Sequence, residues 1–208
     1  MQKSELGSKA FQWATDLISP FSYYCGELDH PFVDSASWPD KIQVSGWKTM
    51  FNWHFTDTKL AAEGFIIPED NTTDEDVIWS IEQAIDFLSS VKKDFSGKSK
   101  EILGKSLEMR NLIHFIGDLH QPLHAVSRFS NEHPKGDLGG NLFTIQHYED
   151  PKWNNLHFIW DHIFDLPETP VPGGGDLWSP IRTPEEWKFL SDFANSLMVE
   201  HPYQSLSA

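Results

Sequence analysis

Residues 100–120 carry the pattern that most restricts how this chain can fold. Apolar side chains recur along them at the spacing of one face of an α-helix. These positions are Ile102, Leu103, Leu107, Leu112, Ile113, Ile116 and Leu119. Pro122 follows almost at once, and a proline interrupts a helix because it lacks the backbone N–H and clashes with the preceding turn. The pattern predicts a helix that ends near His120 and is the longest in the molecule.

Two further segments combine an N-terminal cap with helical spacing. Residues 73–76 (Thr-Asp-Glu-Asp) precede apolar positions over 77–91, which predicts a helix that stops near 96–97. The Thr-Pro-Glu-Glu sequence at 183–186 supplies a cap, a first-turn proline and a capping-box glutamate. A helix should therefore run from this motif to about residue 201.

The rest of the chain adds one short helix and long connections. Residues 154–164 are a shorter helical candidate, whereas 127–141 and 166–180 are rich in Gly, Pro and Asn and are typical of loops. Only 142–146 resembles a strand. The sequence predicts an all-α fold, a single-domain helical bundle with long loops over residues 1–208.

Composition limits the chemistry that the chain can support. Asp and Glu outnumber Lys and Arg by 31 to 16, and no basic cluster is present, which argues against tight duplex binding. A polyanionic substrate would instead need bound cations. Cys25 is the only cysteine, so a metal site must use His, Asp or Glu. Neither a membrane span nor a signal peptide is visible in the sequence.

Pairs of His and Asp four residues apart are the candidate metal ligands. His114 and Asp118 share one face of the long predicted helix, and His157 and Asp161 repeat the spacing. The break at Pro122 lets the chain present His124 beside the first pair. Two such pairs and a further histidine are hard to assign to packing. Upstream, Asp40 and His54 stand among aromatic residues that would keep water from a metal.

Four sequence blocks then show a resemblance to a known family. They are ASWPD at 36–40, NWHFTD at 52–57, HFIGDLHQPLH at 114–124 and NLHFIWD at 155–161, with GGN at 139–141. On these blocks the chain resembles the zinc-dependent, single-strand-specific type I nucleases of fungi and plants, which share a fold with bacterial zinc phospholipase C. The resemblance covers roughly residues 35–164.

The resemblance implies three zinc ions and assigns their ligands. Asp40, His54, His114 and Asp118 would hold the first zinc, and His124, His157 and Asp161 the second. Asp118 would also bridge to a third zinc, which makes Asp40 and Asp118 the catalytic carboxylates. In the family, a hydroxide shared by the first and third zinc attacks phosphorus and the second stabilises the departing 3'-oxygen.

The resemblance also implies a substrate and a cellular location. Phe55 and Asp57 match positions that stack on and hydrogen-bond a base, and Asn141 matches one that contacts substrate near the phosphate. The expected substrates are single-stranded DNA, RNA and 3'-nucleotides, cleaved to 5'-phosphates or to a nucleoside and phosphate. The protein is expected to act as a monomer in an extracellular, secretory or lysosome-like compartment.

Two departures from the family pattern leave alternatives open. Gln43 stands where the family usually has an arginine, and the family's N-terminal Trp-Gly-x-x-Gly-His segment, which binds the third zinc, has no match here. Only two zinc sites are therefore expected to have complete protein ligands, and a truncated start is one explanation of the missing segment. One alternative is a zinc phospholipase C, whose last ligand is Glu rather than Asp161. The other is a non-catalytic zinc-binding remnant.

Overall fold

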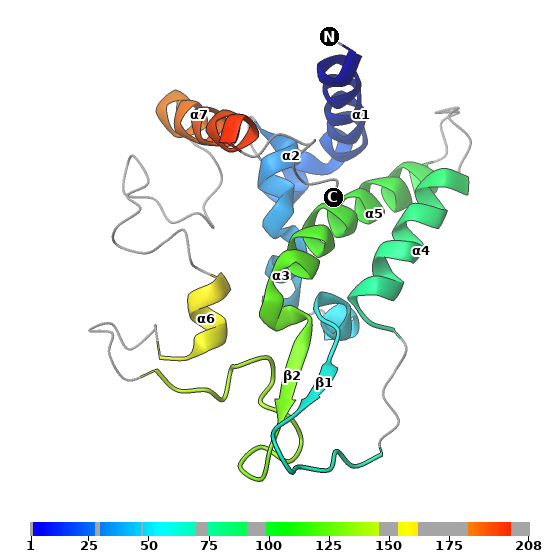
Figure 1. Ribbon diagram of the computed structural model, residues 1–208. Coiled ribbons are helices and arrows are strands. Elements are labelled where there is room, and N and C mark those ends of the chain that lie inside the picture. The colour runs from blue at the N-terminus through cyan, green and yellow to red at the C-terminus, as the bar shows by residue number, and fades with distance from the viewer. Residues whose placement is uncertain are drawn as a thin grey trace.

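The computed structural model describes residues 2–27, 30–46, 48–69, 75–90, 99–145, 154–161 and 183–200 (Figure 1). The helices among them are α1 (Gln2–Cys25), α2 (Pro31–Asp34), α3 (Trp38–Val44), α4 (Val77–Ser90), α5 (Ser99–His120), α6 (Leu156–Asp161) and α7 (Pro184–Glu200). The described residues also form three 3-10 turns, which are η1 (Ser35–Ser37), η2 (Lys48–His54) and η3 (Pro122–His124). The two strands are β1 (Thr58–Ala61) and β2 (Val126–Phe129). The described fold is helical, as predicted.

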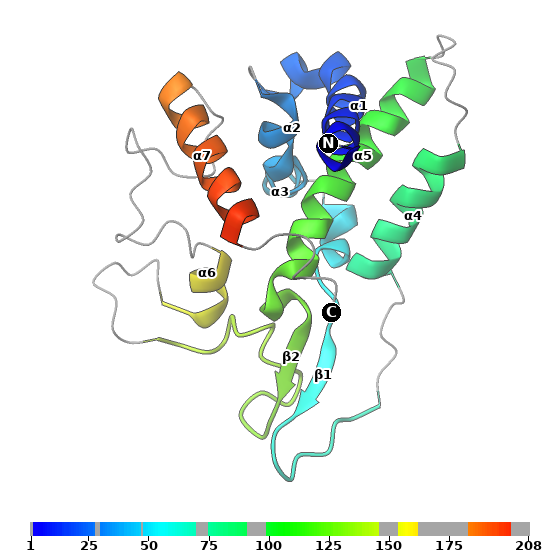
Figure 2. The same ribbon diagram turned by 45° about the horizontal axis from the view of Figure 1, so that its top comes forward.

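Helix α5 is the element against which most of the others pack. It contacts α1, α3 and α4 along its length and the turns η1, η2 and η3 toward its C-terminal end. Figure 2 shows α1 alongside α5 on one side and α4 on the other. The buried cluster between α1 and α5 consists of Ala14, Leu17, Ile18 and Met109, with Phe32, Leu88 and Ile113 packed on it. This core fixes the helix that carries His114 and Asp118.

The buried face of α5 is more polar than the apolar pattern suggests. Arg110 is only 2% exposed and forms a two-pronged ion pair with Glu27, at 2.7 and 2.6 Å. Its guanidinium also lies over the Trp38 ring, 5.7 Å from the ring centre. Ile116 and Leu119, by contrast, are partly exposed. The buried charge of Arg110 is tolerated because it is paired with Glu27. The contact between Arg110 on α5 and Trp38 on α3 holds these two helices together.

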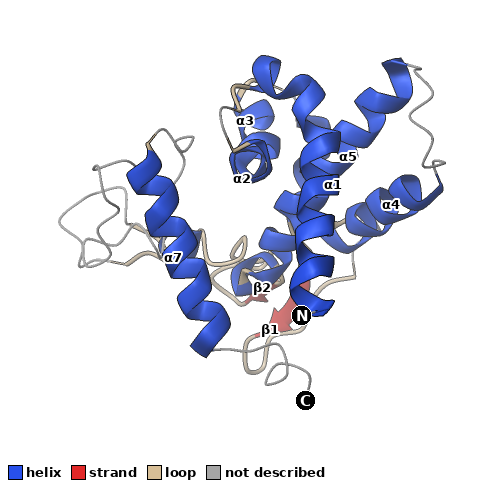
Figure 3. Ribbon diagram, turned by 90° about the horizontal axis from the view of Figure 1, so that it is seen from above, coloured by secondary structure: helices blue, strands red, loops and turns tan. Residues whose placement is uncertain are grey.

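The four predicted helices are confirmed over their described residues, with caps where the sequence places them, whereas their predicted ends near 96–97, 164 and 201 lie outside the described residues. The prediction that α5 is the longest helix is wrong, because α1 has 24 residues and α5 has 22. Pro20 lies inside α1 and interrupts the helical pattern in its sequence. The cap of α4 comes from Asp76, whose Oδ1 accepts the N–H of Ile78 and Trp79 at 2.9 Å. At α7, Thr183 and Glu186 exchange hydrogen bonds at 3.0 and 3.1 Å, the predicted capping box. Figure 3 shows α7 and α4 on opposite sides of the molecule. No described helix is long and apolar enough to span a membrane.

The strand prediction is wrong. Residues 142–145 form only an isolated bridge, between Thr144 and Asn155, while Gln146 lies outside the described residues. Strands β1 and β2 instead pair in parallel, with Thr58 opposite Val126 and Ala61 opposite Phe129. Four-residue strands have too little alternation to be recognised, and β2 therefore fell in a predicted loop. Strand β2 directly follows the turn η3 that carries His124.

Candidate metal centre

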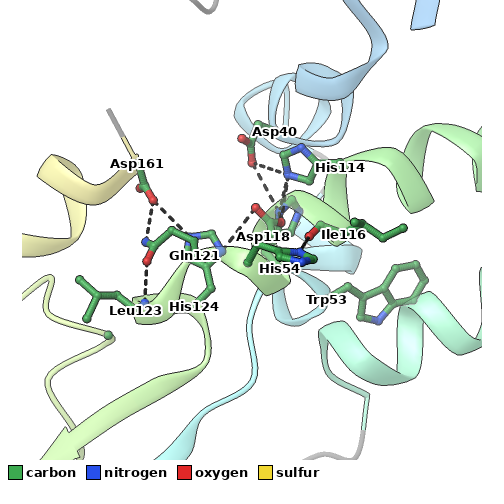
Figure 4. A network of polar contacts seen from close by, with 12 residues as sticks. Asp40, Trp53, His54, His114, Ile116, Asp118, Gln121, Leu123, His124 and Asp161 are labelled. Atoms are coloured by element: carbon green, nitrogen blue, oxygen red, sulfur yellow. Dashed lines mark hydrogen bonds and ion pairs between the residues drawn. The ribbon is translucent and has the colours of Figure 1, made fainter. Parts of the chain in front are cut away.

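Four of the predicted ligands converge at the C-terminal half of α5 (Figure 4). His54 Nδ1 and His114 Nε2 lie 3.0 Å apart, and Asp118 Oδ2 lies 3.0 Å from the first and 3.1 Å from the second. Asp40 Oδ1 lies 3.5 Å from both nitrogens. We call these four residues the first cluster.

The first cluster is assembled from three segments held on one helix. His114 and Asp118 are one turn apart on α5, Asp40 lies on α3, and His54 ends η2. Both α3 and η2 pack on α5 and on each other. The second ring nitrogen of His114, Nδ1, hydrogen-bonds the carbonyl oxygen of Ala36, which leaves Nε2 directed at the cluster.

The other three predicted ligands form a second cluster beside the first. His124 Nε2 lies 3.3 Å from Asp161 Oδ1, and His157 Nε2 lies 3.4 Å from Asp161 Oδ2. The two imidazole rings stack with their centres 4.9 Å apart. Asp118 joins the clusters, because its Oδ1 lies 3.4 Å from His124 Nδ1. Asp118 is the residue that the resemblance assigns to a third metal.

A glycine-lined turn orients His157. The carbonyl oxygen of Gly139 accepts a hydrogen bond from His157 Nδ1 at 2.8 Å, which directs Nε2 toward Asp161. Gly139 has φ +60°, and a Cβ there would lie 2.2 Å from the carbonyl oxygen of Leu123. Only glycine fits this close approach between the 139–141 turn and η3.

The spacing of the ligand atoms fits a metal ion. Four donors about 2.1 Å from a zinc ion in a tetrahedron lie about 3.4 Å from one another. The separations given above run from 3.0 to 3.5 Å in the first cluster and are 3.3 and 3.4 Å for the two His–Asp pairs in the second. One ligand atom from each of Asp40, His54 and His114, and from each of His124, His157 and Asp161, lies within 4.8 Å of the others in its group. Buried His124 Nδ1 lies 3.4 Å from Asp118 Oδ1 but makes no hydrogen bond within the described residues. Hydrogen bonding alone therefore does not account for this close contact.

The charges within the clusters shift one another strongly. Burial lowers the pKa of His114, but contacts with Asp118 and Asp40 outweigh it and raise that pKa to about 10. Burial likewise lowers the pKa of His124, and Asp118 and Asp161 raise it to about 9. Burial opposes ionisation of Asp118, whereas contacts with His114 and His124 hold its pKa far below the usual range. The carboxylates stay charged and attract either protons on the imidazoles or a cation.

Both clusters open onto one cleft of about 620 Å³. All ten predicted site residues line it: Asp40, Phe55, Asp57, His54, His114, Asp118, His124, Asn141, His157 and Asp161. Phe55 meets Phe51 edge-on, with ring centres 5.6 Å apart. No Lys or Arg is among the described residues that line the cleft. The side chains are brought together, while their roles as zinc ligands and substrate contacts stay predictions.

Comparisons with known proteins identify the family of the chain. The family model described as S1/P1 Nuclease matches residues 3–201. The chain belongs to the S1/P1 nuclease family. Members of this family depend on metal ions, and the chain contains candidate metal-ligand groups.

Three endonucleases of Arabidopsis thaliana are relatives of this S1/P1 family member. Endonuclease 5 is 30% identical over 135 residues, which are 63% of the chain and 43% of that protein. Endonuclease 3 is 32% identical over 62% of the chain and 40% of its own length, and Endonuclease 4 is 30% identical over 65% and 44%. The alignments thus span less than half of each relative. No solved structure matches the chain.

Sequence reasoning missed several residues that shape the cleft of this nuclease-family chain. Gln121 contacts Asp161 and Leu123, Gly139 orients His157, and Trp160 lines the cleft beside Asp161. The glycine pair at 139–140 signals an unusual backbone conformation, and a glutamine just before Pro122 is compatible with a cap. The partners of these residues lie far away in the sequence, so their contacts carry no local signal.

Proposed function

We propose that the chain is a zinc-dependent nuclease that hydrolyses phosphodiester bonds in single-stranded DNA and RNA. It releases 5'-phosphorylated products and also removes phosphate from 3'-nucleotides. The observation that carries the proposal is the opening of two His/Asp clusters, each with the atom spacing of a metal site, onto one cleft. Membership of the S1/P1 nuclease family supports the class of reaction.

The charges of the cleft support a reaction on an anionic substrate only with metals bound. The first cluster carries two carboxylates, so one Zn²⁺ brings its sum from −2 to 0. The second carries one carboxylate, so one Zn²⁺ brings its sum from −1 to +1. Because no Lys or Arg is among the described lining residues, this neutralisation is what lets a phosphodiester approach.

The aromatic residues at the cleft support a preference for unpaired bases. Phe55 lines the cleft and packs edge-on against Phe51. Asp57, two residues further along the chain, also lines the cleft. A base can stack on an aromatic face only when it is out of a duplex, and stacking accepts any base. The chain's net charge of −15 also disfavours duplex binding through the backbone. Phe55 and Asp57 therefore bind the base, and Asn141 contacts the substrate near the phosphate.

In this proposal the clusters divide the work of in-line displacement. Asp40, His54, His114 and Asp118 hold one ion, and His124, His157 and Asp161 hold the other. Bound zinc supplies Lewis-acid stabilisation of charge at the phosphate and lowers the pKa of water. Asp118 is shared, because its two oxygens face different clusters. Movement at this carboxylate therefore affects both halves of the site. We also propose a monomer that acts in an extracellular or secretory compartment.

An assay on purified, metal-stripped chain tests the proposal. Zinc should restore cleavage of heat-denatured DNA and of RNA but not of duplex DNA, and should restore phosphate release from 3'-AMP. Magnesium serves as the control ion, because the nitrogen-rich ligand sets suit zinc. Turnover of a choline phospholipid without DNA cleavage would favour a zinc phospholipase C. Zinc binding without any hydrolysis would favour a non-catalytic zinc-binding domain.

A further inference from the structure

Gln121 lies between the end of α5 and the turn η3, and both ends of its carboxamide are occupied. Its Oε1 accepts the N–H of Leu123 at 2.6 Å, and its Nε2 donates to Asp161 Oδ1 at 2.9 Å (Figure 4). The N–H of Leu123 can only donate, so it fixes the oxygen of the amide on its own side. The amino group must then face Asp161.

The same residue contacts three predicted ligands through its backbone and side chain. Its N–H donates to the carbonyl oxygen of Asp118, and its own carbonyl oxygen accepts the N–H of His124, both at 3.0 Å. The side-chain bond to Leu123 caps the turn that carries His124. Gln121 thus holds one ligand through local geometry and another, Asp161, across forty positions of sequence.

The hydrogen bond from Gln121 sets the orientation of the Asp161 carboxylate. Oδ1 receives the amide donor and lies 3.3 Å from His124 Nε2, while Oδ2 lies 3.4 Å from His157 Nε2. A carboxylate oxygen has two lone pairs, so one donor on Oδ1 fixes the plane of the group without blocking it. Such outer hydrogen bonds tune metal sites as strongly as many direct ligands.

We propose that Gln121 is the positioning residue of the second cluster, which sets the metal affinity of that cluster by fixing Asp161 and His124 together. The inference rests on the proposed function, since it takes the second cluster to be a metal site. The first cluster has no side-chain contact with Gln121 among the described hydrogen bonds, so loss of the amide acts on one site of the two.

Zinc titration of the metal-stripped chain by calorimetry tests this inference. The wild type should show two binding events. Gln121→Met keeps the side chain's length but removes both hydrogen bonds, and should weaken one event by about 10- to 100-fold while the other is unchanged. Gln12→Met is the matched control, because Gln12 makes the same kind of bond, to Asp16 at 2.8 Å, on the exposed face of α1. It should titrate like the wild type.

Further readouts separate positioning from stability. Cobalt bound in place of zinc should show altered visible absorption at one site in Gln121→Met, and His157→Ala should abolish any additional effect of Gln121→Met on metal binding. Gln121→Asn retains an amide on a shorter side chain, so its zinc affinity at the second cluster should lie between those of the wild type and Gln121→Met. This variant replaces Gln121→Met in the test if the Met variant fails to fold. Two unchanged affinities, or an equal loss at both sites with a lower Tm, would overturn the inference. A wild type that binds no zinc would instead overturn the proposed function.

Discussion

The two clusters differ in what holds them together. The side chains of His54, His114 and Asp118 are 8%, 9% and 12% exposed, against 14%, 18% and 27% for His124, His157 and Asp161. The first cluster sits where α3, η2 and α5 pack on one another, with only Asp40 more open. The second joins η3 to the short helix α6 mainly through polar contacts at Gln121 and Gly139. Buried packing should preform the first site, whereas the second depends on individual hydrogen bonds.

Asp118→Asn should have the largest effect, because the Asp118 carboxylate belongs to the first cluster and also lies 3.4 Å from His124 of the second. An amide offers one neutral oxygen where two anionic oxygens are needed. Loss of several kcal/mol of charge stabilisation corresponds to roughly a thousand-fold fall in kcat on denatured DNA. Elemental analysis should also show less bound zinc. Asp86→Asn on the exposed face of α4 is the control, and near-wild-type rates in Asp118→Asn would remove it from the mechanism.

Gly139→Ala should break the second cluster and spare the first. The substitution places a Cβ 2.2 Å from Leu123 O and moves the carbonyl that orients His157. Gly64→Ala is the matched control, since Gly64 also has positive φ, +75°, but open space around it. Both variants carry the penalty of about 1–2 kcal/mol for an L-residue in the left-handed backbone region. The difference between the two variants therefore measures the effect of the contact between the new Cβ and Leu123 O. Gly139→Ala should bind one zinc ion fewer than the wild type, and its Tm should fall further than that of Gly64→Ala. Equal Tm and zinc content in the two variants would contradict the close approach.

The stability of the protein should depend on pH in opposite ways with and without metal. His114 and His124 have folded pKa values of about 10 and 9, above the ordinary 6.5, so without metal their contribution is full below pH 6.5 and is lost as pH rises toward 9–10. Asp118 and Asp161 have lowered pKa values, so their contribution is lost as pH falls below about 3.8. Zinc needs the deprotonated ligands, so its stabilisation grows with pH.

Thermal melting in chelator and in saturating zinc measures this difference. The gap in Tm between the two conditions should widen from pH 6 to pH 9. In His157→Ala, where the first cluster alone is intact, a widening gap should persist if packing preforms that cluster. Parallel melting curves in the wild type would show that the imidazoles do not exchange protons for metal.

The difference between the clusters also explains what the sequence could predict. Helix α5 and the His-x-x-x-Asp pairs follow from local spacing, so His114, Asp118, His157 and Asp161 could be named as candidate ligands from the sequence alone. The burial of Arg110 could not be predicted, because its partner Glu27 lies 83 positions away in the sequence. The pairing of β1 with β2 and the bond between Gln121 and Asp161 are long-range in the same way. The residues that line the clusters were predictable, whereas the contacts that hold them in place depend on tertiary packing.

Gln43→Arg should give the smallest effect and probes the open edge of the first cluster. Gln43 lines the cleft on α3, three residues after the most exposed ligand, Asp40. An arginine there would add the side-chain cation that the described lining lacks. A partly exposed ion pair contributes about 0.2–1 kcal/mol, which corresponds to a fall in KM for denatured DNA of roughly 1.5- to 5-fold. Because screening weakens such a contact, the gain should shrink at high salt, with kcat unchanged throughout. Gln12→Arg adds the same charge on α1 and controls for net charge. If both variants lower KM equally, the effect belongs to the whole molecule's field, and Gln43 has no special place beside the first cluster.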